Sequence, residues 1–156
     1  MGTPKALLDA GGECFLDRLA GVFLDAGCTV YAVTGEHSAD IQAGTRRGGS
    51  IAFVRNPDPS RGQLSSLQCG LRAVPPGLRG IFFTPVDAPG IARQTVLTLM
   101  ERLGDSDFAI PVCAGRHGHP VLMRAACAGE FLEAGAEASA RDILHAGRGH
   151  TRFVDV

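Results

Sequence analysis

The sequence has no excess of positive charge and no long apolar run. Its 15 basic and 16 acidic residues give a formal net charge of −1, whereas a protein that binds duplex nucleic acid usually carries a basic face. No apolar stretch approaches the roughly 20 residues that span a bilayer. The residues after Met1 also lack the basic and apolar regions of a signal peptide. We therefore expect a cytoplasmic protein that binds neither nucleic acid nor a membrane.

The sequence also lacks any Cys-x-x-Cys pair, and its number of cysteines is odd. The five are Cys14, Cys28, Cys69, Cys113 and Cys127. A disulfide framework needs cysteines that can be paired, so the thiols are expected to be reduced, as in a reducing cytosol.

What the chain does contain is a regular alternation of helical and strand-like segments. Its 156 residues are 45% hydrophobic and 20% charged, which suits one globular domain over residues 1–156. Helices are expected at 15–26, 38–47, 64–74, 92–103, 125–132 and 140–145. Strands are expected at 29–34, 50–54, 80–84, 108–112, 120–123 and 151–156. This order predicts an α/β fold with a parallel sheet covered on both faces, and ligands at the carboxyl ends of its strands.

Lys5 follows a glycine in the segment Met1-Gly-Thr-Pro-Lys5. A lysine in such a place is most often a solvated surface charge. A cation beside a glycine turn is also a way of holding a triphosphate. Both interpretations stay open on this residue alone.

Asp87 lies just past a strand-like run, between Pro85 and Pro89. An aspartate after a strand often caps the next helix. The alternative is a carboxylate ligand for Mg²⁺, which is typically held by one or two carboxylates together with substrate phosphates.

A third group of polar residues surrounds the start of the helix expected at 64–74. Asn56 precedes the helix, Gly62 lets the backbone approach a ligand, and Ser65 or Ser66 suits a helix cap. The same start of a helix beside a strand end is a natural place for contacts with phosphate, ribose or base.

The glycine-rich segment 115–120 is expected to be a tight turn in a β-ribbon at the rim of a site. Cys113, His117 and His119 near it invite a zinc interpretation. A structural zinc site needs four ligands, and no fourth is evident, so the turn is favoured over the metal.

Taken together, these segments resemble the molybdenum-cofactor nucleotidyltransferase-like family. Members open with a strand and a loop of the type Leu-Ala-Ala-Gly-x-Ser-x-Arg-Met-Gly-x-x-Lys, and residues 1–5 match its last five positions. Residues 61–70 resemble a Gly-x-x-Ser-Ser-Leu-x-x-Gly segment, and residues 84–89 match a metal-binding Pro-x-Asp-x-Pro motif. Residues 118–122 match a Gly-His-Pro segment, and residues 140–144 resemble a late element. The order and spacing of these matches make the resemblance specific.

The resemblance implies a three-layer, Rossmann-like fold with a mostly parallel sheet and an Mg²⁺-dependent nucleotidyl transfer. An NMP unit would pass from CTP or GTP to a phosphorylated acceptor such as the molybdopterin cofactor, with release of pyrophosphate. Lys5 and Asp87 would be catalytic, and Asp87 would hold the metal. The nucleotide would meet Gly2, Lys5, Asn56, Gly62 and Ser66; the acceptor would meet Gly118 and His119. A homodimer is compatible with this interpretation. The alternative is a non-catalytic remnant that binds a nucleotide or a protein partner.

The resemblance also predicts a defect at the centre of the sheet. The family's first strand and the glycine-rich half of its loop would precede the position of Met1. Without that strand, the segments 29–34 and 80–84 are left with unpaired backbone groups, which are costly when buried. We therefore expect the sheet to close directly, to borrow a strand from a neighbour, or to be poorly stable.

Overall fold

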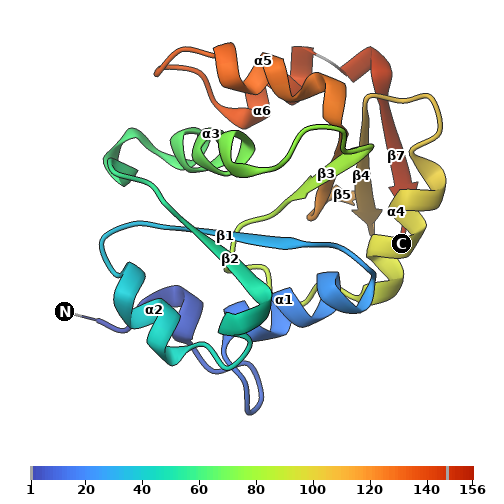
Figure 1. Ribbon diagram of the computed structural model, residues 1–156. Helices are drawn as coiled ribbons and strands as arrows, with labels where there is room; N and C mark the ends of the chain where they lie inside the picture. Colours follow the sequence, from blue (N-terminus) through green and yellow to red (C-terminus); the bar gives the residue numbers. More distant parts are fainter. Residues whose placement is uncertain (1, 147) are drawn as a thin grey trace.

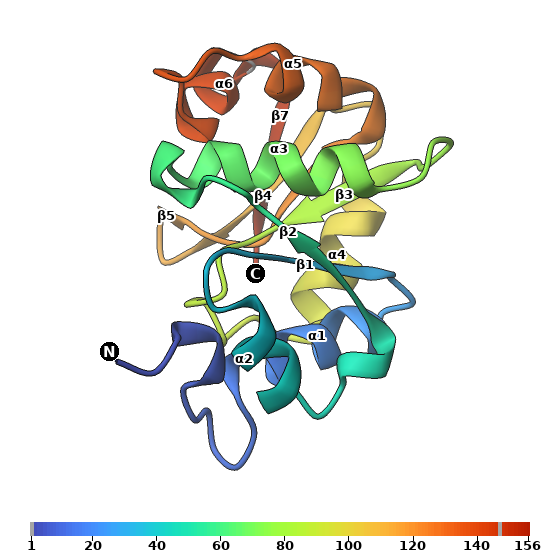
Figure 2. The same cartoon turned by 60° about the vertical axis from the view of Figure 1, so that its left-hand side comes forward.

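The computed structural model describes residues 2–146 and 148–156, which form three layers (Figures 1 and 2). The helices are α1 Phe15–Asp25, α2 Ser38–Gly44, α3 Gln63–Ala73, α4 Arg93–Arg102, α5 Ala128–Glu133 and α6 Ala140–Ala146. The strands are β1 Val30–Thr34, β2 Ile51–Arg55, β3 Gly80–Phe83, β4 Phe108–Cys113, β5 Arg116–His117, β6 Val121–Arg124 and β7 Thr151–Asp155. Helices α3, α5 and α6 lie on one side of the strands, and α1, α2 and α4 lie on the other. The predicted α/β class and the position of every predicted element are confirmed, although Met1 itself lies outside the described residues.

The strands pair in both directions: the expected parallel pairings are present, and antiparallel ones join them. Strand β1 is parallel to β2, and β4 is parallel to β7. Strand β6 is antiparallel to both β3 and β4, and β5 is antiparallel to β4. The reason is local: only the short segment around β5 joins β4 to β6, and a parallel return requires a crossover of a dozen or more residues.

The centre of the sheet is open. Strands β1 and β2 form one sheet, whereas β3 begins a second sheet in the order β3, β6, β4, β5, with β7 beside β4. Among the described residues, therefore, no strand pairs with the inner edge of β1 or of β3. A cavity of about 1740 Å³ lies there, and residues of both strands line it. We call this cavity the slot. Of the three outcomes expected for the sheet, direct closure does not occur, because β1 and β3 are not paired with each other.

The hydrophobic core is divided in the same way. Leu16 and Ala20 of α1 pack with Ala32 of β1 in one cluster of buried side chains. Across the slot, Phe108 of β4 packs with Phe131 of α5 in another, their ring centroids 6.1 Å apart. Because side chains alternate along a strand, β3 contributes to both faces of its sheet. Each half thus has its own buried centre, and the slot runs between them.

Asp17, on α1, is a buried carboxylate that holds a distant loop against this helix. Its oxygens accept hydrogen bonds from the backbone amides of Arg46, at 3.0 Å, and Arg47, at 2.9 Å. The Cys14 thiol lies 3.2 Å from the same carboxylate. Burial alone would raise the pKa of Asp17, but these hydrogen bonds more than offset it and lower the pKa below its ordinary value of 3.8.

We expect Asp17→Asn to lower the free energy of unfolding by about 2 kcal/mol at pH 7, because an amide nitrogen would face a backbone N–H donor. Since the folded-state pKa is lowered, this stabilisation is complete above pH 3.8 and is lost as the pH falls through the lowered pKa. Urea unfolding at pH 7 and at pH 3 measures both effects. Asp25→Asn, an exposed carboxylate on the same helix, is the control and should change little at either pH.

Candidate active site

Lys5 and Asp87 form an ion pair near one end of the slot. Lys5 lies in a short 3₁₀ turn, Lys5–Leu7, and its Nζ is 3.0 Å from Oδ2 of Asp87. Both side chains are well exposed, at 70% and 47%. An exposed pair of this kind contributes at most about 1 kcal/mol to stability. Both charges are therefore available to a ligand at little cost to the fold.

The loop that carries Asp87 is fixed by Arg18 of α1. The Arg18 Nε donates to the carbonyl oxygen of Pro89, at 3.1 Å, and its Nη1 donates to that of Ala10, at 3.0 Å. One guanidinium thus joins the loop after β3 to the turn that precedes α1. The sequence does not reveal this role, since an arginine on the polar face of an amphipathic helix has no distinguishing pattern.

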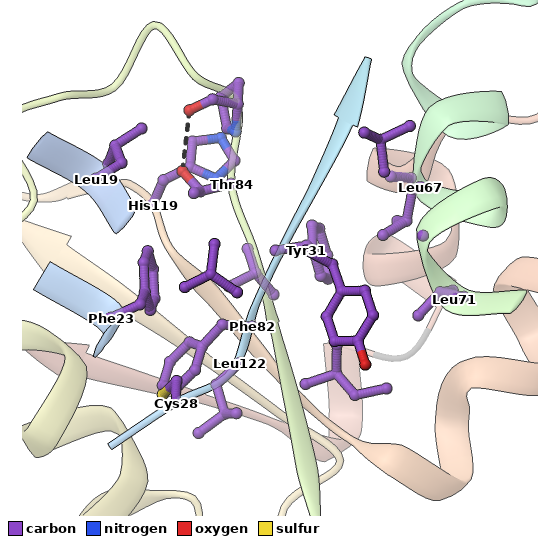
Figure 3. Close-up of a pocket in the computed structure, with 18 of the residues that line it drawn as sticks. Leu19, Phe23, Cys28, Tyr31, Leu67, Leu71, Phe82, Thr84, His119 and Leu122 are labelled. Atoms are coloured by element: carbon purple, nitrogen blue, oxygen red, sulfur yellow. Dashed lines mark hydrogen bonds between the residues drawn. The ribbon is translucent and has the colours of Figure 1, made fainter. Parts of the chain in front are cut away.

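His119 stands at the same end of the slot, close to Thr84 (Figure 3). The residue is exposed at the mouth, yet its ring lies partly among neighbouring side chains. This partial burial lowers the pKa of His119, and the negative charge of Asp87 opposes the shift. The imidazole is therefore mainly neutral at pH 7, with one nitrogen able to donate a hydrogen bond and the other able to accept one.

Asn56 is buried, at 3% exposure, and its side chain is fully engaged. Its Nδ2 donates to the hydroxyls of Ser65, at 2.9 Å, and Ser66, at 3.0 Å, and its Oδ1 accepts from the amide of Asp58, at 3.0 Å. The backbone N–H of Asn56 also donates to the backbone carbonyl of Thr34, at the end of β1. Asn56 and Ser66, both expected to meet the nucleotide, are in contact with each other. Their hydrogen bonds connect the end of β1 to the start of α3.

Helix α3 begins without a side-chain cap. Its N-cap position is Gly62, whose φ of 87° is a conformation that favours glycine. Ser65 and Ser66 lie inside the first turn, and Ser65 donates its hydroxyl proton back to the carbonyl of Gly62, at 2.8 Å. Neither serine therefore caps the helix as predicted. The backbone N–H groups of the first turn have no side-chain partner at the N-cap and are available to an anionic group of a ligand.

The zinc alternative finds no support in the arrangement of the 115–120 turn. The ring of His117 stacks on that of Phe153, with centroids 4.4 Å apart. Over residues 2–146 and 148–156, no three His, Cys, Asp or Glu side chains gather as a metal site would require. The segment forms the β-ribbon between β4 and β6, as the turn interpretation predicted.

The structure brings together only part of the predicted set. Lys5, Ser66, Gly118 and His119 line the slot. Asp87 lies beside them through its bond to Lys5. Gly2, Asn56 and Gly62 do not line this cavity.

A magnesium ion fits this arrangement only in part. Asp87 offers one exposed carboxylate, and no second carboxylate stands with it among the residues that line the slot near Lys5. Magnesium commonly binds one or two carboxylates and completes its six ligands with water and substrate phosphates. Asp87 therefore suits a metal that arrives with a polyphosphate better than a metal held by protein alone.

Known structures share this fold. Rv0371c from Mycobacterium tuberculosis H37Rv superposes with a TM-score of 0.84 at 24% identity, over 100% of this chain and 80% of its own; it has also been solved in complex with manganese. A Methanothermobacter nucleotidyl transferase gives a TM-score of 0.77 at 23% identity, over 97% and 74% of the two chains. Molybdopterin-guanine dinucleotide biosynthesis protein A from Archaeoglobus fulgidus gives 0.59 at 15%, over 99% and 76%. The fold is thus that of the Rossmann-like nucleotidyltransferases.

The sequence itself assigns the chain more narrowly. Residues 1–151 match the MobA-like NTP transferase domain, and the chain belongs to that family. No curated protein matches. In the described part of the chain, no helix is both long and apolar enough to cross a membrane.

We predict that Asn56→Ala destabilises the protein by about 1–3 kcal/mol, because it leaves buried polar groups at the contact between β1 and α3 without partners. Thermal unfolding measures the loss. Gln63→Ala, which removes an exposed amide side chain at the start of α3, is the matched control. If both variants unfolded at the same temperature, the hydrogen bonds of Asn56 would not stabilise the contact between β1 and α3.

Proposed function

We propose that this chain forms the body of an Mg²⁺-dependent nucleotidyltransferase. It would transfer an NMP from CTP or GTP to a phosphorylated acceptor, such as the molybdopterin cofactor, and release pyrophosphate. The observation that carries the proposal is the Lys5–Asp87 pair, which sets one exposed cation and one exposed carboxylate at the slot that Gly118 and His119 also line. Family membership supports the class of reaction, but it does not identify the nucleotide or the acceptor.

The proposed chemistry needs neutralisation of charge more than a protein nucleophile. A phosphate oxygen of the acceptor attacks the α-phosphorus of the NTP. The bond from that phosphorus to its bridging oxygen breaks, and pyrophosphate leaves with the electron pair. Negative charge is spread over the phosphoryl oxygens during transfer, so fixed cations and hydrogen-bond donors stabilise the transition state.

Each site residue has a role in this scheme. In the free protein, the charges of Lys5 and Asp87 neutralise each other. When the nucleotide and metal bind, Lys5 would turn to the phosphates and Asp87 to the metal, which would supply Lewis-acid charge neutralisation. Gly2, Gly62 and the open first turn of α3 would approach the nucleotide through backbone amides. Neutral His119 and Gly118 would meet the acceptor, and Asn56 and Ser66 would hold the wall of the pocket in place.

A second candidate is a non-catalytic member that binds a nucleotide or a protein partner. The slot is the observation that favours it, because a cavity between β1 and β3 beside the site can hold a ligand without any transfer reaction. The two candidates share a cytoplasmic location and a possible homodimer, and they differ in turnover.

We predict that CTP or GTP with Mg²⁺ raises the melting temperature, since ligands that bind only the folded state stabilise it. CTP and GTP should differ from ATP in this effect. Asp87→Asn should remove the metal-dependent part of the shift without altering the unliganded protein, because the change removes charge at constant shape. Asp105→Asn, an exposed carboxylate in the turn after α4, is the control. No shift with any NTP at millimolar concentration would favour the second candidate.

We also predict that the 156-residue chain releases little pyrophosphate from an NTP. Lys5 supplies charge without fixed geometry, whereas efficient transfer needs donors held in place. A strand and a glycine-rich loop added ahead of residue 1 should raise the rate at least tenfold under identical conditions. Equal rates for the two forms would show that the triphosphate binds elsewhere.

A further inference from the structure

The residues next to Lys5 and Asp87 both pack on helix α1. Ala6, after Lys5, is buried in the cluster of apolar side chains that includes the inner face of α1, and Val86, before Asp87, packs against the same cluster. The two charged side chains themselves are well exposed. The main chain beside each charge is therefore held against α1, although the charge itself faces solvent.

On the other side of Asp87, the loop is held by Arg18. The loop has few backbone bonds of its own: Pro85 and Pro89 have no N–H, and the N–H of Ala88 is 3.4 Å from the carbonyl oxygen of Pro85. The Nε of Arg18 donates to the carbonyl of Pro89 at the shorter distance of 3.1 Å. If that bond were lost, the chain after Asp87 would be free to move away from α1.

Arg18 is itself held in place. Its Nη1 donates to the carbonyl of Ala10, at 3.0 Å, and this second bond orients the guanidinium that reaches Pro89. The position of the Asp87 carboxylate matters because magnesium binds its oxygen ligands at about 2.0–2.1 Å in nearly octahedral geometry. A displacement of roughly 1 Å would therefore remove Asp87 as a ligand.

We propose that Arg18 is the positioning residue of Asp87. By holding the carbonyl of Pro89, it keeps the Asp87 carboxylate where a metal-bound polyphosphate can reach it together with Lys5. Arg18 acts through the backbone and needs no contact with the ligand. The consequence for metal and nucleotide rests on the proposed function, whereas the order of the loop does not, so the two can fail separately.

The first test measures the order of the loop without any ligand. In Arg18→Ala, the backbone order parameters of residues 86–88, measured by NMR, should fall from the rigid range of about 0.85 towards about 0.6. Arg93→Ala is the matched control: the Arg93 Nε also donates to a backbone carbonyl of α1, that of Asp25, at 3.0 Å, and its loss leaves the bond to Pro89 intact. Equal order parameters in the two variants would overturn the proposal.

The second test measures the binding of Mn²⁺ together with CTP or GTP, by the relaxation of water protons. Arg18→Ala should weaken the apparent affinity about tenfold, because the carboxylate is no longer held in place, and Arg93→Ala should stay within about twofold of the wild type. In an Asp87→Asn background, Arg18→Ala should cause no further loss, since residues that act through one contact are not additive. Additive losses would show that Arg18 does not act through Asp87.

A third test restores the missing group. Ethylguanidinium has the atoms that Arg18→Ala removes, so millimolar amounts should recover the loop order and the affinity of this variant. Ethylammonium has the same charge but lacks the planar set of donors, and it should recover neither. Equal recovery with both cations would overturn the role of the guanidinium. A wild-type chain that binds neither nucleotide would count against the proposed function alone, because the order parameters still decide the role of Arg18.

Discussion

The constraint that governs this molecule is the pairing of backbone groups across the middle of its sheet. Each half of the chain satisfies its own strands: β1 with β2, and β3 with β6. Between the halves, contact is made by side chains and helices, such as the rings of Phe23 and Phe82. The halves also carry separate buried clusters. The two halves are therefore held together by contacts between side chains and helices and not by backbone pairing between β1 and β3.

The same constraint shapes the site. Lys5 and Asp87 come from segments 82 residues apart and meet at the end of the slot. Asp87 follows β3, whereas Lys5 leads into the half that contains β1 and β2. The pair therefore spans the two halves at the place where the chemistry is proposed. The site is therefore assembled across the opening between β1 and β3 and not within either half.

Much of the fold was accessible from the sequence because its signals are local. Helix α1 shows an apolar face that ends at a glycine, and β1 is a short β-branched run, so both elements were predicted within about a residue of their bounds. The open centre of the sheet was also predicted, from the resemblance of residues 1–5 to the end of a longer loop. The ribbon of β4 and β6 was predicted from the glycine-rich turn between them, whereas the antiparallel pairing of β6 with β3 was not, because it joins segments that are distant in the sequence and leaves no local signal.

The candidate site was predictable in residue type more than in role. Lys5, Asp87, Gly118 and His119 do gather near one end of the slot. Asn56 instead directs its amide to Ser65 and Ser66, a set of bonds that exists only once β2 and α3 are side by side. A sequence does not show whether a polar residue faces a ligand or another residue of the protein. The exposure of the side chain in the structure distinguishes the two cases: Asn56 is buried, whereas Lys5 and Asp87 are exposed.

Arg18 adds a geometric restriction that applies to any ligand at this site. Two nitrogens of one planar group hold the carbonyls of Pro89 and Ala10, so the spacing between the two loops is set by the span of a guanidinium. The ammonium of a lysine has no such fork and could not hold that spacing. The Asp87 loop and the turn before α1 are therefore held at a fixed distance from each other. In the proposed nucleotide complex, the Asp87 loop would therefore keep its position, and the exposed side chain of Lys5 would be the part that adjusts to the phosphates.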